Sequence, residues 1–296
     1  MRVQGALAAA VTPLRVDQSV DAAGIEALTG YYRAAGLDGL LVLGTTGEGA
    51  LLSVAERQEL ATRFLTAAQG GLPVVVHCGA QSTRDTMVLA EHAASVAAAG
   101  VAVIPPPYYP LDDESLMAHL VAAARACAPT PFYLYEFAAR SGYSIPVEVV
   151  LELRQRASNL AGLKVSDSPF DQVRPYLLEG LDVFIGAEGL IAQGLAGGAA
   201  GAVSGLAAAL PELTIRAVRE GTAAASEEAA RVRTAIQRWP FQSALKTVLQ
   251  LRGVAIEAAV RSPLRTLTPG ESAELAELVR TLGLAEAQNT ARSSSS

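Results

Sequence analysis

The stretch Leu160-Ala-Gly-Leu-Lys-Val165 is a short apolar run that contains one charged residue, and similar runs recur along the chain. Eight such runs occur, at residues 7–11, 39–43, 73–77, 101–104, 132–135, 160–165, 183–185 and 201–204. A continuously apolar run is typical of a strand that is buried on both faces of a parallel sheet. The sequence therefore predicts a parallel sheet whose strands are separated by other elements.

Helix signals lie between these runs. Ser53-Val-Ala-Glu56 has the capping-box pattern and precedes an amphipathic segment that reaches Ala68. A second helix is expected from Ser82 towards Ala99, and Pro146 is expected as the first residue of a third. Eight strand–helix units in roughly 210 residues favour a (β/α)8 TIM barrel, an α/β fold. A doubly wound open sheet is the alternative, but it usually has fewer strands and a glycine-rich fingerprint after the first.

The expected organisation has three parts. Residues 1–212 form the barrel, residues 213–287 form the last barrel helix and a small C-terminal helical layer, and residues 288–296 form a disordered tail. Helices are expected at 216–238, 243–251 and 268–282. The uncharged stretch 189–211 is rich in glycine and alanine, so we interpret it as a helix, a turn and a buried strand rather than a membrane span.

Composition excludes several classes of protein. Hydrophobic residues make up 51% of the chain and charged residues 18%, which suits a large core and excludes global disorder. A net charge of −6 argues against a nucleic-acid partner. Two cysteines do not form a disulfide framework, and the N-terminus lacks a long apolar signal core, so we expect a cytoplasmic protein.

Lys164 is the strongest candidate for chemistry. The chain has only two lysines, Lys164 and Lys246, against 21 arginines. Arginine cannot deprotonate, whereas a desolvated lysine can act as a nucleophile and form Schiff bases with carbonyl substrates. The structural alternative is a paired lysine whose stem packs while its charged head reaches solvent.

In a barrel of this kind the chemistry lies at the C-terminal ends of the strands. Those ends carry a lysine, tyrosines, hydroxyls with free backbone amides and an arginine, which are Thr12, Gly44-Thr-Thr-Gly-Glu48, His77, Tyr108-Tyr109, Tyr135-Glu136, Arg140, Lys164, Gly186 and Ser204. Each also has a structural interpretation: a plain turn, a core aromatic, loop packing or a solvated charge. We interpret His77 as a strand end without a catalytic role. No spacing of His, Cys or Asp resembles a metal site, so no metal or other cofactor is expected, which favours imine chemistry.

Together these residues resemble a known family. Gly44-Thr-Thr-Gly-Glu48, Pro107-Tyr-Tyr109, Tyr135 with Arg140-Ser-Gly142, and Gly162-Leu-Lys164 resemble the dihydrodipicolinate synthase / N-acetylneuraminate lyase family. The segments 244–249 and 261–264 extend the likeness, which covers nearly all of residues 5–285. The resemblance implies a class I aldolase or lyase that handles pyruvate on a barrel, usually as a homotetramer.

The resemblance also implies a role for each matching residue. Lys164 would form the Schiff base with pyruvate, Thr45 and Thr46 would hold the pyruvate carboxylate, and Tyr135 would carry protons. Tyr109 would complete the proton relay with Thr45 from a neighbouring subunit. Arg140 would bind the carboxylate of the second substrate. Gly186 and Val203 would line the pyruvate pocket.

The sequence departs from the family pattern at several positions. Glu136 stands where the synthases often have Asn, and Ala138 stands where Pro is usual. A carboxylate at the mouth would repel an anionic aldehyde but could bind the hydroxyls of a sugar. Val54, Arg57 and Gln81 replace side chains of the synthases' lysine-feedback site, so the resemblance does not imply feedback inhibition.

The resulting expectation is a 4-hydroxy-tetrahydrodipicolinate synthase that condenses pyruvate with aspartate semialdehyde, because Arg140 favours an acidic acceptor. The alternative is a 2-keto-3-deoxy sugar acid aldolase or dehydratase, which Glu136 favours. Two other classes stay open: a catalytically silent barrel that binds a keto acid, and a phosphate-binding barrel, for which the loops after the last strands provide little support.

Overall fold

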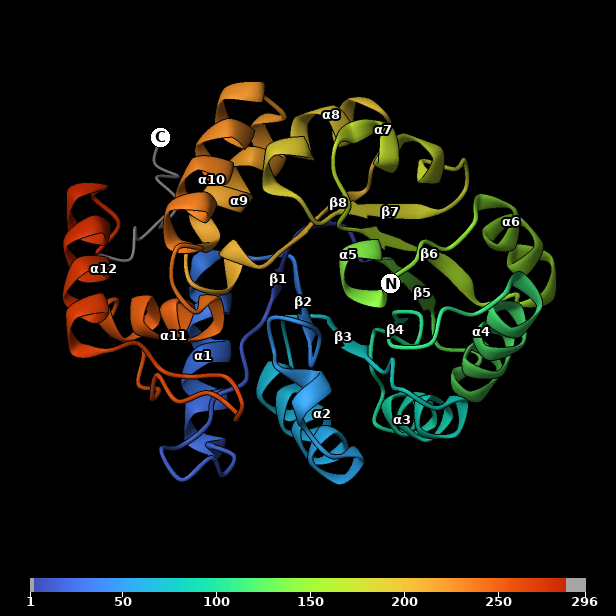
Figure 1. The fold of residues 1–296 in the computed structure, drawn as a ribbon, viewed down its shortest axis with the longest axis horizontal. Helices are drawn as coiled ribbons and strands as arrows, with labels where there is room; N and C mark the ends of the chain where they lie inside the picture. Colours follow the sequence, from blue (N-terminus) through green and yellow to red (C-terminus); the bar gives the residue numbers. More distant parts are fainter. Residues whose placement is uncertain (1–2, 286–296) are drawn as a thin grey trace.

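The computed structural model describes residues 3–285, and its centre is a closed barrel of eight parallel strands in chain order (Figure 1). The strands are β1 (Gly5–Ala9), β2 (Gly39–Val42), β3 (Val74–His77), β4 (Gly100–Val103), β5 (Phe132–Glu136), β6 (Leu160–Val165), β7 (Asp182–Ile185) and β8 (Gly201–Ser204). All eight predicted strands are present. The first lies two residues earlier than expected, because its pairing with β8 begins at Gly5 and its register with β2 ends at Ala9.

Twelve α-helices surround the barrel in the described part of the chain. They are α1 (Ala22–Ala35), α2 (Val54–Ala68), α3 (Thr83–Ser95), α4 (Asp113–Cys127), α5 (Ala138–Ser141), α6 (Val147–Arg156), α7 (Phe170–Val173), α8 (Ile191–Ala196), α9 (Pro211–Glu220), α10 (Ala223–Ile236), α11 (Phe241–Leu251) and α12 (Pro269–Thr281). Four 3₁₀ turns accompany them: η1 (Gly49–Leu51), η2 (Arg174–Tyr176), η3 (Glu188–Leu190) and η4 (Leu206–Ala208).

The helix signals succeed where a side chain caps the first turn. Ser53 and Thr268 form the predicted capping boxes at α2 and α12. Helix α3 ends at Ser95, four residues before the expected end, and Ala97 just beyond it has φ +62°. Pro146 is the N-cap of α6 rather than its first helical residue.

The C-terminal region differs from the expectation in one respect. The helix expected at 216–238 is two helices, because the chain turns at Gly221 with φ +62° and Thr222 caps the start of α10. Helix α9 packs against β1 and β8 and completes the barrel, while α10, α11 and α12 form the outer layer. The boundary expected after residue 212 lies inside α9, and the tail expected at 288–296 lies outside the described residues.

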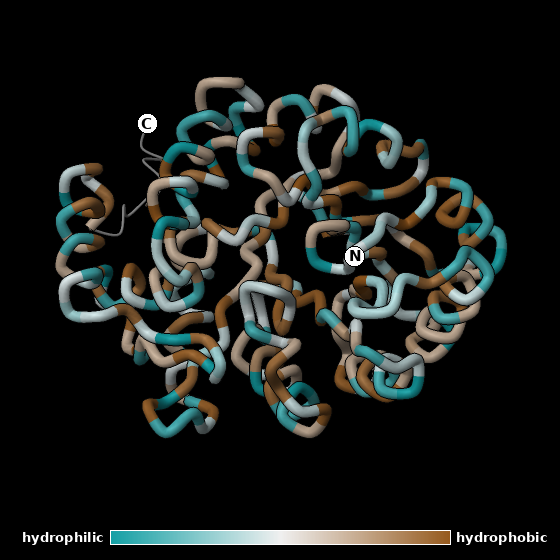
Figure 2. Tube along the Cα trace, in the orientation of Figure 1, coloured by the Kyte–Doolittle hydropathy of each residue, from teal (hydrophilic) through white to brown (hydrophobic). Residues whose placement is uncertain are grey.

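Strand alternation divides the core into two parts. Side chains that point inward fill the barrel, namely Val3, Leu7, Ala9, Leu41, Val75, Ala102, Tyr133, Phe184 and Val203. The alternate positions of the same strands, such as Leu134 and Val165, join a larger cluster between the strands and the helices. Figure 2 shows the central strands as mostly hydrophobic, whereas hydrophilic residues recur along the outer helices.

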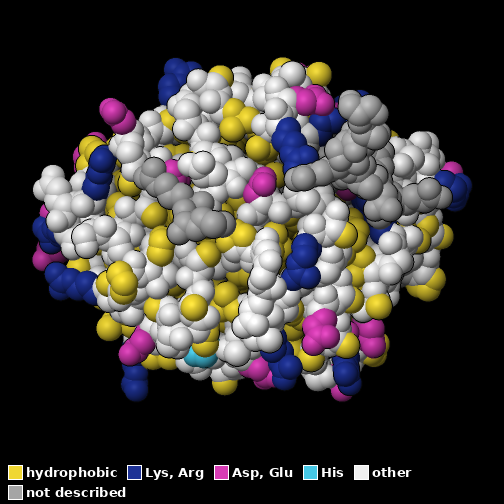
Figure 3. Space-filling model, turned by 180° about the vertical axis from the view of Figure 1, so that it is seen from behind, with side chains coloured by type: hydrophobic (Ala, Val, Ile, Leu, Met, Phe, Trp, Pro, Cys, Tyr) yellow, Lys and Arg dark blue, Asp and Glu magenta, His cyan; other side chains and the backbone are white. Residues whose placement is uncertain are grey.

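On the face shown in Figure 3, basic and acidic side chains are interspersed. The stretch 189–211 folds as η3, α8, β8 and η4. No helix among residues 3–285 is long and apolar enough to cross a membrane.

Candidate active site

Lys164 lies on β6 with its side chain in the barrel. It is 8% exposed, and it lines a small apolar cavity with Leu7, Leu41, Val75, Ala102, Tyr133, Phe184 and Val203. Its Nζ lies 4.0 Å from the centre of the Tyr135 ring. Among residues 3–285, no carboxylate forms an ion pair with it. A buried amine with apolar walls and no carboxylate partner is suited to nucleophilic attack.

Tyr135 is the direct neighbour of this amine, because β5 and β6 are in register at Tyr135 and Lys164. Its hydroxyl lies 3.3 Å from Thr45 Oγ1, within hydrogen-bond distance. Burial alone would raise the pKa of Tyr135. The Lys164 charge and hydrogen bonds with Thr45, Lys164 and Ser166 oppose burial, and the net effect lowers this pKa. A phenol with a lowered pKa beside an amine can exchange protons with it.

The loop after β2 supplies hydroxyls and free amides. Neither the Thr45 nor the Thr46 backbone N–H donates a hydrogen bond within residues 3–285. Thr12 donates to the Gly47 carbonyl at 2.6 Å, and the Gly49 N–H donates to the Gly44 carbonyl at 3.1 Å, so the loop is fixed at both ends. We use the term cradle for residues 44–47. Free amides and hydroxyls in one turn are a suitable binding place for a carboxylate.

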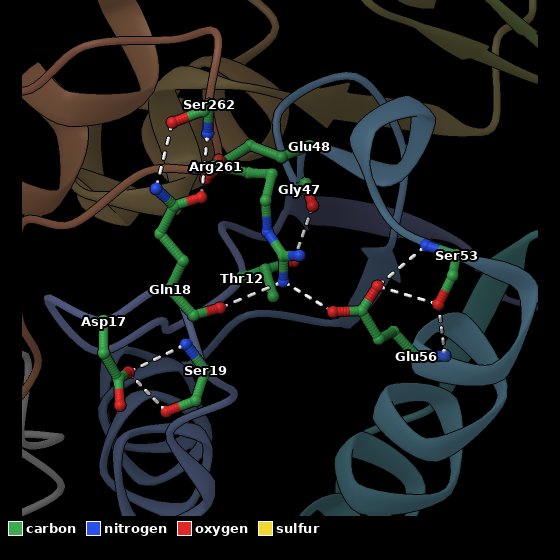
Figure 4. Close-up of polar contacts among 10 residues, drawn as sticks. All are labelled: Thr12, Asp17, Gln18, Ser19, Gly47, Glu48, Ser53, Glu56, Arg261 and Ser262. Carbon is green, nitrogen blue, oxygen red and sulfur yellow. Dashed lines mark hydrogen bonds and ion pairs between the residues drawn. The ribbon is translucent and has the colours of Figure 1, made fainter.

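The other lysine has a structural role and fixes the end of the cradle. Lys246 on α11 is completely buried and donates to Glu48 at 2.7 Å and to the Ala259 carbonyl at 2.5 Å. Glu48 also accepts from the Arg261 N–H at 2.6 Å. Figure 4 shows the Arg261 guanidinium between Gln18 and Glu56, bonded to both. The C-terminal layer therefore holds the cradle from outside the barrel.

His77 faces the same interior, although sequence reasoning gave it no catalytic role. Its ring meets the Tyr135 ring edge-on at 5.8 Å. Burial, then the charges of Arg57 and Lys164, lowers the pKa of His77 to about 3, so the ring is neutral at pH 7. Its Nδ1 lies 3.2 Å from the Leu43 carbonyl and 3.4 Å from Arg57 Nη2. In this structure His77 contributes a neutral wall behind Tyr135.

Arg140 and Tyr109 lie further out at the same end of the barrel, Arg140 on α5 and Tyr109 on the loop after β4. The Arg140 guanidinium is exposed and lies 5.8 Å from the centre of the Phe137 ring, which in turn stacks on Tyr135 at 6.2 Å. Tyr109 is 72% exposed and contacts Tyr108 rather than Tyr135 or Thr45. Within one chain the structure brings Arg140 near Tyr135 but leaves Tyr109 away from it.

Glu136 is not at the mouth, which corrects the role expected for it as a substrate-binding residue. It is 1% exposed and lies in the layer between strands and helices, because it follows the inward-facing Tyr135 on the same strand. Its Oε2 accepts from the Ile145 N–H at 2.7 Å. Burial, with the facing Asp167 charge, raises the pKa of Glu136 to about 8. This pair joins the ends of β5 and β6.

Gly186 and Val203 lie on neighbouring strand ends, Gly186 directly after β7 and Val203 on β8. Val203 points into the barrel and lines the cavity beside Lys164. A Cβ on Gly186 would lie 2.1 Å from Ser166 Oγ, so only glycine leaves room for Ser166 next to Tyr135. Sequence reasoning missed Ser166, and it missed Gln242, which donates to the Thr45 carbonyl at 3.2 Å. Among residues 3–285 no cluster of three or more His, Cys, Asp or Glu side chains could hold a metal ion.

Comparisons with known proteins agree with this geometry. The sequence model of the dihydrodipicolinate synthetase family matches residues 2–282. An uncharacterized DapA-like lyase of Halobacterium salinarum is 36% identical over 95% of both chains, and an N-acetylneuraminate lyase of Rhizobium meliloti is 31% identical over 99% of this chain and 100% of its own. A prophage protein of the dihydrodipicolinic acid synthase family from E. coli K12, solved in complex with pyruvate, superposes with a TM-score of 0.90 at 25% identity, over 96% of this chain and 100% of its own. The chain therefore belongs to the dihydrodipicolinate synthetase family and is an enzyme of that family's aldolase–lyase class.

Proposed function

We propose that this enzyme is a class I aldolase that binds pyruvate as a Schiff base on Lys164. The observation that carries the proposal is the buried Lys164 amine, which has no carboxylate partner among residues 3–285 and lies 4.0 Å from the ring of Tyr135. The Thr45 hydroxyl lies within hydrogen-bond distance of the Tyr135 hydroxyl, so the free amides of Thr45 and Thr46 are close to Tyr135. At this position they can bind the carboxylate of a keto acid.

The reaction follows from these groups. The Lys164 amine attacks the C2 carbonyl of pyruvate, and loss of water leaves a protonated imine. The imine withdraws electrons, so the pyruvate methyl can lose a proton and become an enamine carbon that attacks an aldehyde. Tyr135 can donate and accept the protons of these steps, because its pKa is lowered and its hydroxyl contacts Thr45. Hydrolysis of the imine then releases the product.

For the acceptor we propose aspartate semialdehyde, which would make the enzyme a 4-hydroxy-tetrahydrodipicolinate synthase. Arg140 supports this choice, because its exposed guanidinium is free to bind a second carboxylate beside Phe137. The alternative is an aldolase or dehydratase whose substrate is a 2-keto-3-deoxy sugar acid. The likeness to the N-acetylneuraminate lyase supports the alternative, whereas Glu136 no longer does because it is buried outside the barrel.

The wider assembly is also part of the proposal. Tyr108 and Tyr109 are exposed aromatic side chains on one loop, which suits contact with another copy of the chain. We infer a homotetramer in which Tyr109 enters a neighbouring site. Two free, buried cysteines suit a cytoplasmic location.

Borohydride reduction in the presence of pyruvate tests the chemistry. Peptide mass mapping should find the added mass on Lys164, and Lys164→Arg should abolish both the adduct and turnover. An unmodified Lys164 at saturating pyruvate would refute the imine. Turnover with aspartate semialdehyde, compared with turnover of 2-keto-3-deoxy sugar acids, then identifies the acceptor. Lack of activity with the semialdehyde would remove the synthase assignment and leave the imine chemistry intact.

A further inference from the structure

Arg233 is a cation that the C-terminal layer brings to the cradle. It lies in the last turn of α10, and its Nη1 donates to Glu188 Oε1 at 3.1 Å. Its guanidinium carbon lies 3.9 Å from the centre of the Phe241 ring. Glu188 is itself 5% exposed and accepts from the Ser204 hydroxyl at 2.6 Å. A carboxylate on one side and an aromatic face on the other fix the guanidinium plane.

Gly205 shows how near the guanidinium comes to the cradle. A Cβ placed on Gly205 would lie 2.8 Å from Arg233 Nη1 and 3.2 Å from Thr46 Oγ1. The guanidinium and the Thr46 hydroxyl therefore both pack closely against Gly205, which has no side chain to separate them. Thr46 reaches this place from the loop after β2, and Arg233 reaches it from α10.

The guanidinium keeps donors to spare. Its Nε is buried without a hydrogen-bond partner, and within residues 3–285 its Nη2 donates to nothing. The side chain is 23% exposed, so part of it remains accessible to a small ligand. Arginine binds carboxylates well because its donors are arranged in a rigid plane and its charge is permanent.

We propose that Arg233 is a substrate-binding residue that recognises the carboxylate of the keto acid in the cradle. Thr45 and Thr46 supply neutral donors, and Arg233 supplies the positive charge that the cradle itself lacks. Glu188 and Phe241 are positioning residues that aim the guanidinium. The inference rests on the proposed function in one respect only, namely that a keto acid forms an imine on Lys164.

The test compares two ketones that differ in charge. Pyruvate carries the carboxylate, whereas hydroxyacetone is a methyl ketone without one, and borohydride can trap either on Lys164. Mass spectrometry of the Lys164 peptide at increasing ketone concentration gives the half-saturating concentration of each. Arg233→Gln should raise this concentration for pyruvate by about 10- to 100-fold, since a hydrogen bond to a charged group contributes on that scale. The value for hydroxyacetone should change less than about twofold.

Matched variants separate binding from structure. Arg233→Lys should recover part of the pyruvate affinity, because it restores the charge without the planar donors. Arg231→Gln, at an exposed position of the same helix, should leave both ketones unaffected. The double variant Glu188→Gln/Arg233→Gln removes both charges of the pair, so it shows the same pyruvate defect without an unpaired buried carboxylate.

The two proposals fail in different ways. If wild-type Lys164 is not trapped by pyruvate, the imine function and the ligand inferred for Arg233 are both wrong. If wild type is trapped but Arg233→Gln weakens both ketones equally, or neither, then Arg233 only ties α10 to β7 and β8 and the inference is wrong. If Arg233→Gln does not fold, the double variant Glu188→Gln/Arg233→Gln is measured in its place, and the same results support or refute the inference.

Discussion

Replacement of Lys246 by methionine should destabilise the protein severely, because it leaves a buried charge without its partner. Lys246 and Glu48 are both completely buried as side chains and are 2.7 Å apart. Methionine has a similar length but no charge, so Glu48 would keep only its bond from the Arg261 N–H. Breaking a buried pair on one side costs about 3–5 kcal/mol. That is a large part of a typical unfolding free energy of about 5–15 kcal/mol.

The double variant Glu48→Gln/Lys246→Met provides the decisive comparison. It also removes the Glu48 charge, which the single variant leaves without a partner. We therefore expect it to recover all but about 1–2 kcal/mol of the lost unfolding free energy. Urea unfolding followed by circular dichroism measures all three proteins. Glu277→Gln, which breaks an ion pair whose side chains are 66% and 60% exposed, is the surface control and should cost at most about 1 kcal/mol.

The Lys246→Met variant also tests whether the Lys246–Glu48 pair supports the cradle. Glu48 directly follows Gly47, so a change at Lys246 should weaken pyruvate trapping in the protein that remains folded. A Lys246→Met protein as stable as the Glu277→Gln control would refute the reasoning, since it would mean that Glu48 finds another partner or becomes neutral at no cost.

Three further predictions concern the site and its supports. Tyr135→Phe should lower kcat about 10²- to 10⁴-fold, the usual contribution of a general acid–base group, while the Lys164–pyruvate adduct still forms; an unchanged kcat would exclude Tyr135 as the proton carrier. Gly186→Ala should cost about 1–3 kcal/mol in urea unfolding and reduce turnover, since its Cβ would meet Ser166 Oγ at 2.1 Å; Gly30→Ala, whose Cβ meets nothing within 4 Å, is the control, and equal effects would contradict the steric argument. The pKa of Glu136 is raised from 4.5 to about 8, so the folded state holds its proton more tightly than the unfolded state. The resulting stabilisation is complete below about pH 4.5 and is lost as pH rises through 8, by at most about 1.4 kcal/mol per pH unit. Glu136→Gln should flatten this dependence in unfolding measured from pH 5 to 8, and parallel curves for the two proteins would disprove the raised pKa of Glu136.

The strands could be predicted because each is buried on both faces and therefore reads as a continuous apolar run. The ends of α2 and α12 could be predicted because the capping side chains are local in sequence. The break between α9 and α10 was missed, since good helix formers continue on both sides and only the pair Gly221-Thr222 marks the turn. Once a barrel is assumed, Lys164, Tyr135 and the cradle share one end because parallel strands all end at the same rim.

The residues that sequence reasoning missed come from elements outside the barrel pattern. Gln242 bonds to the Thr45 carbonyl, and Arg233 packs against Gly205, only because α10 and α11 dock against the barrel, and no local signal encodes that docking. Glu136 is different, because a signal was present. Neighbouring residues of a strand point to opposite faces, so an inward Tyr135 forces Glu136 outward.

The two lysines show why burial alone does not identify a catalytic amine. Lys246 is more deeply buried than Lys164, but its ammonium group donates to Glu48 and to the Ala259 carbonyl. Its charge therefore holds Glu48 in place at the end of the cradle. Lys164 faces apolar walls and a phenol, and no carboxylate among residues 3–285 forms an ion pair with it. What separates the roles is the partner of each amine. A carboxylate keeps the cation in place, whereas a phenol of lowered pKa can take its proton and return it. The chain has arginine at its other strongly basic positions, so Lys164 and Lys246 are the only two side chains on which an imine adduct can be found. Because their environments are opposite, locating the adduct on one of them gives an unambiguous test.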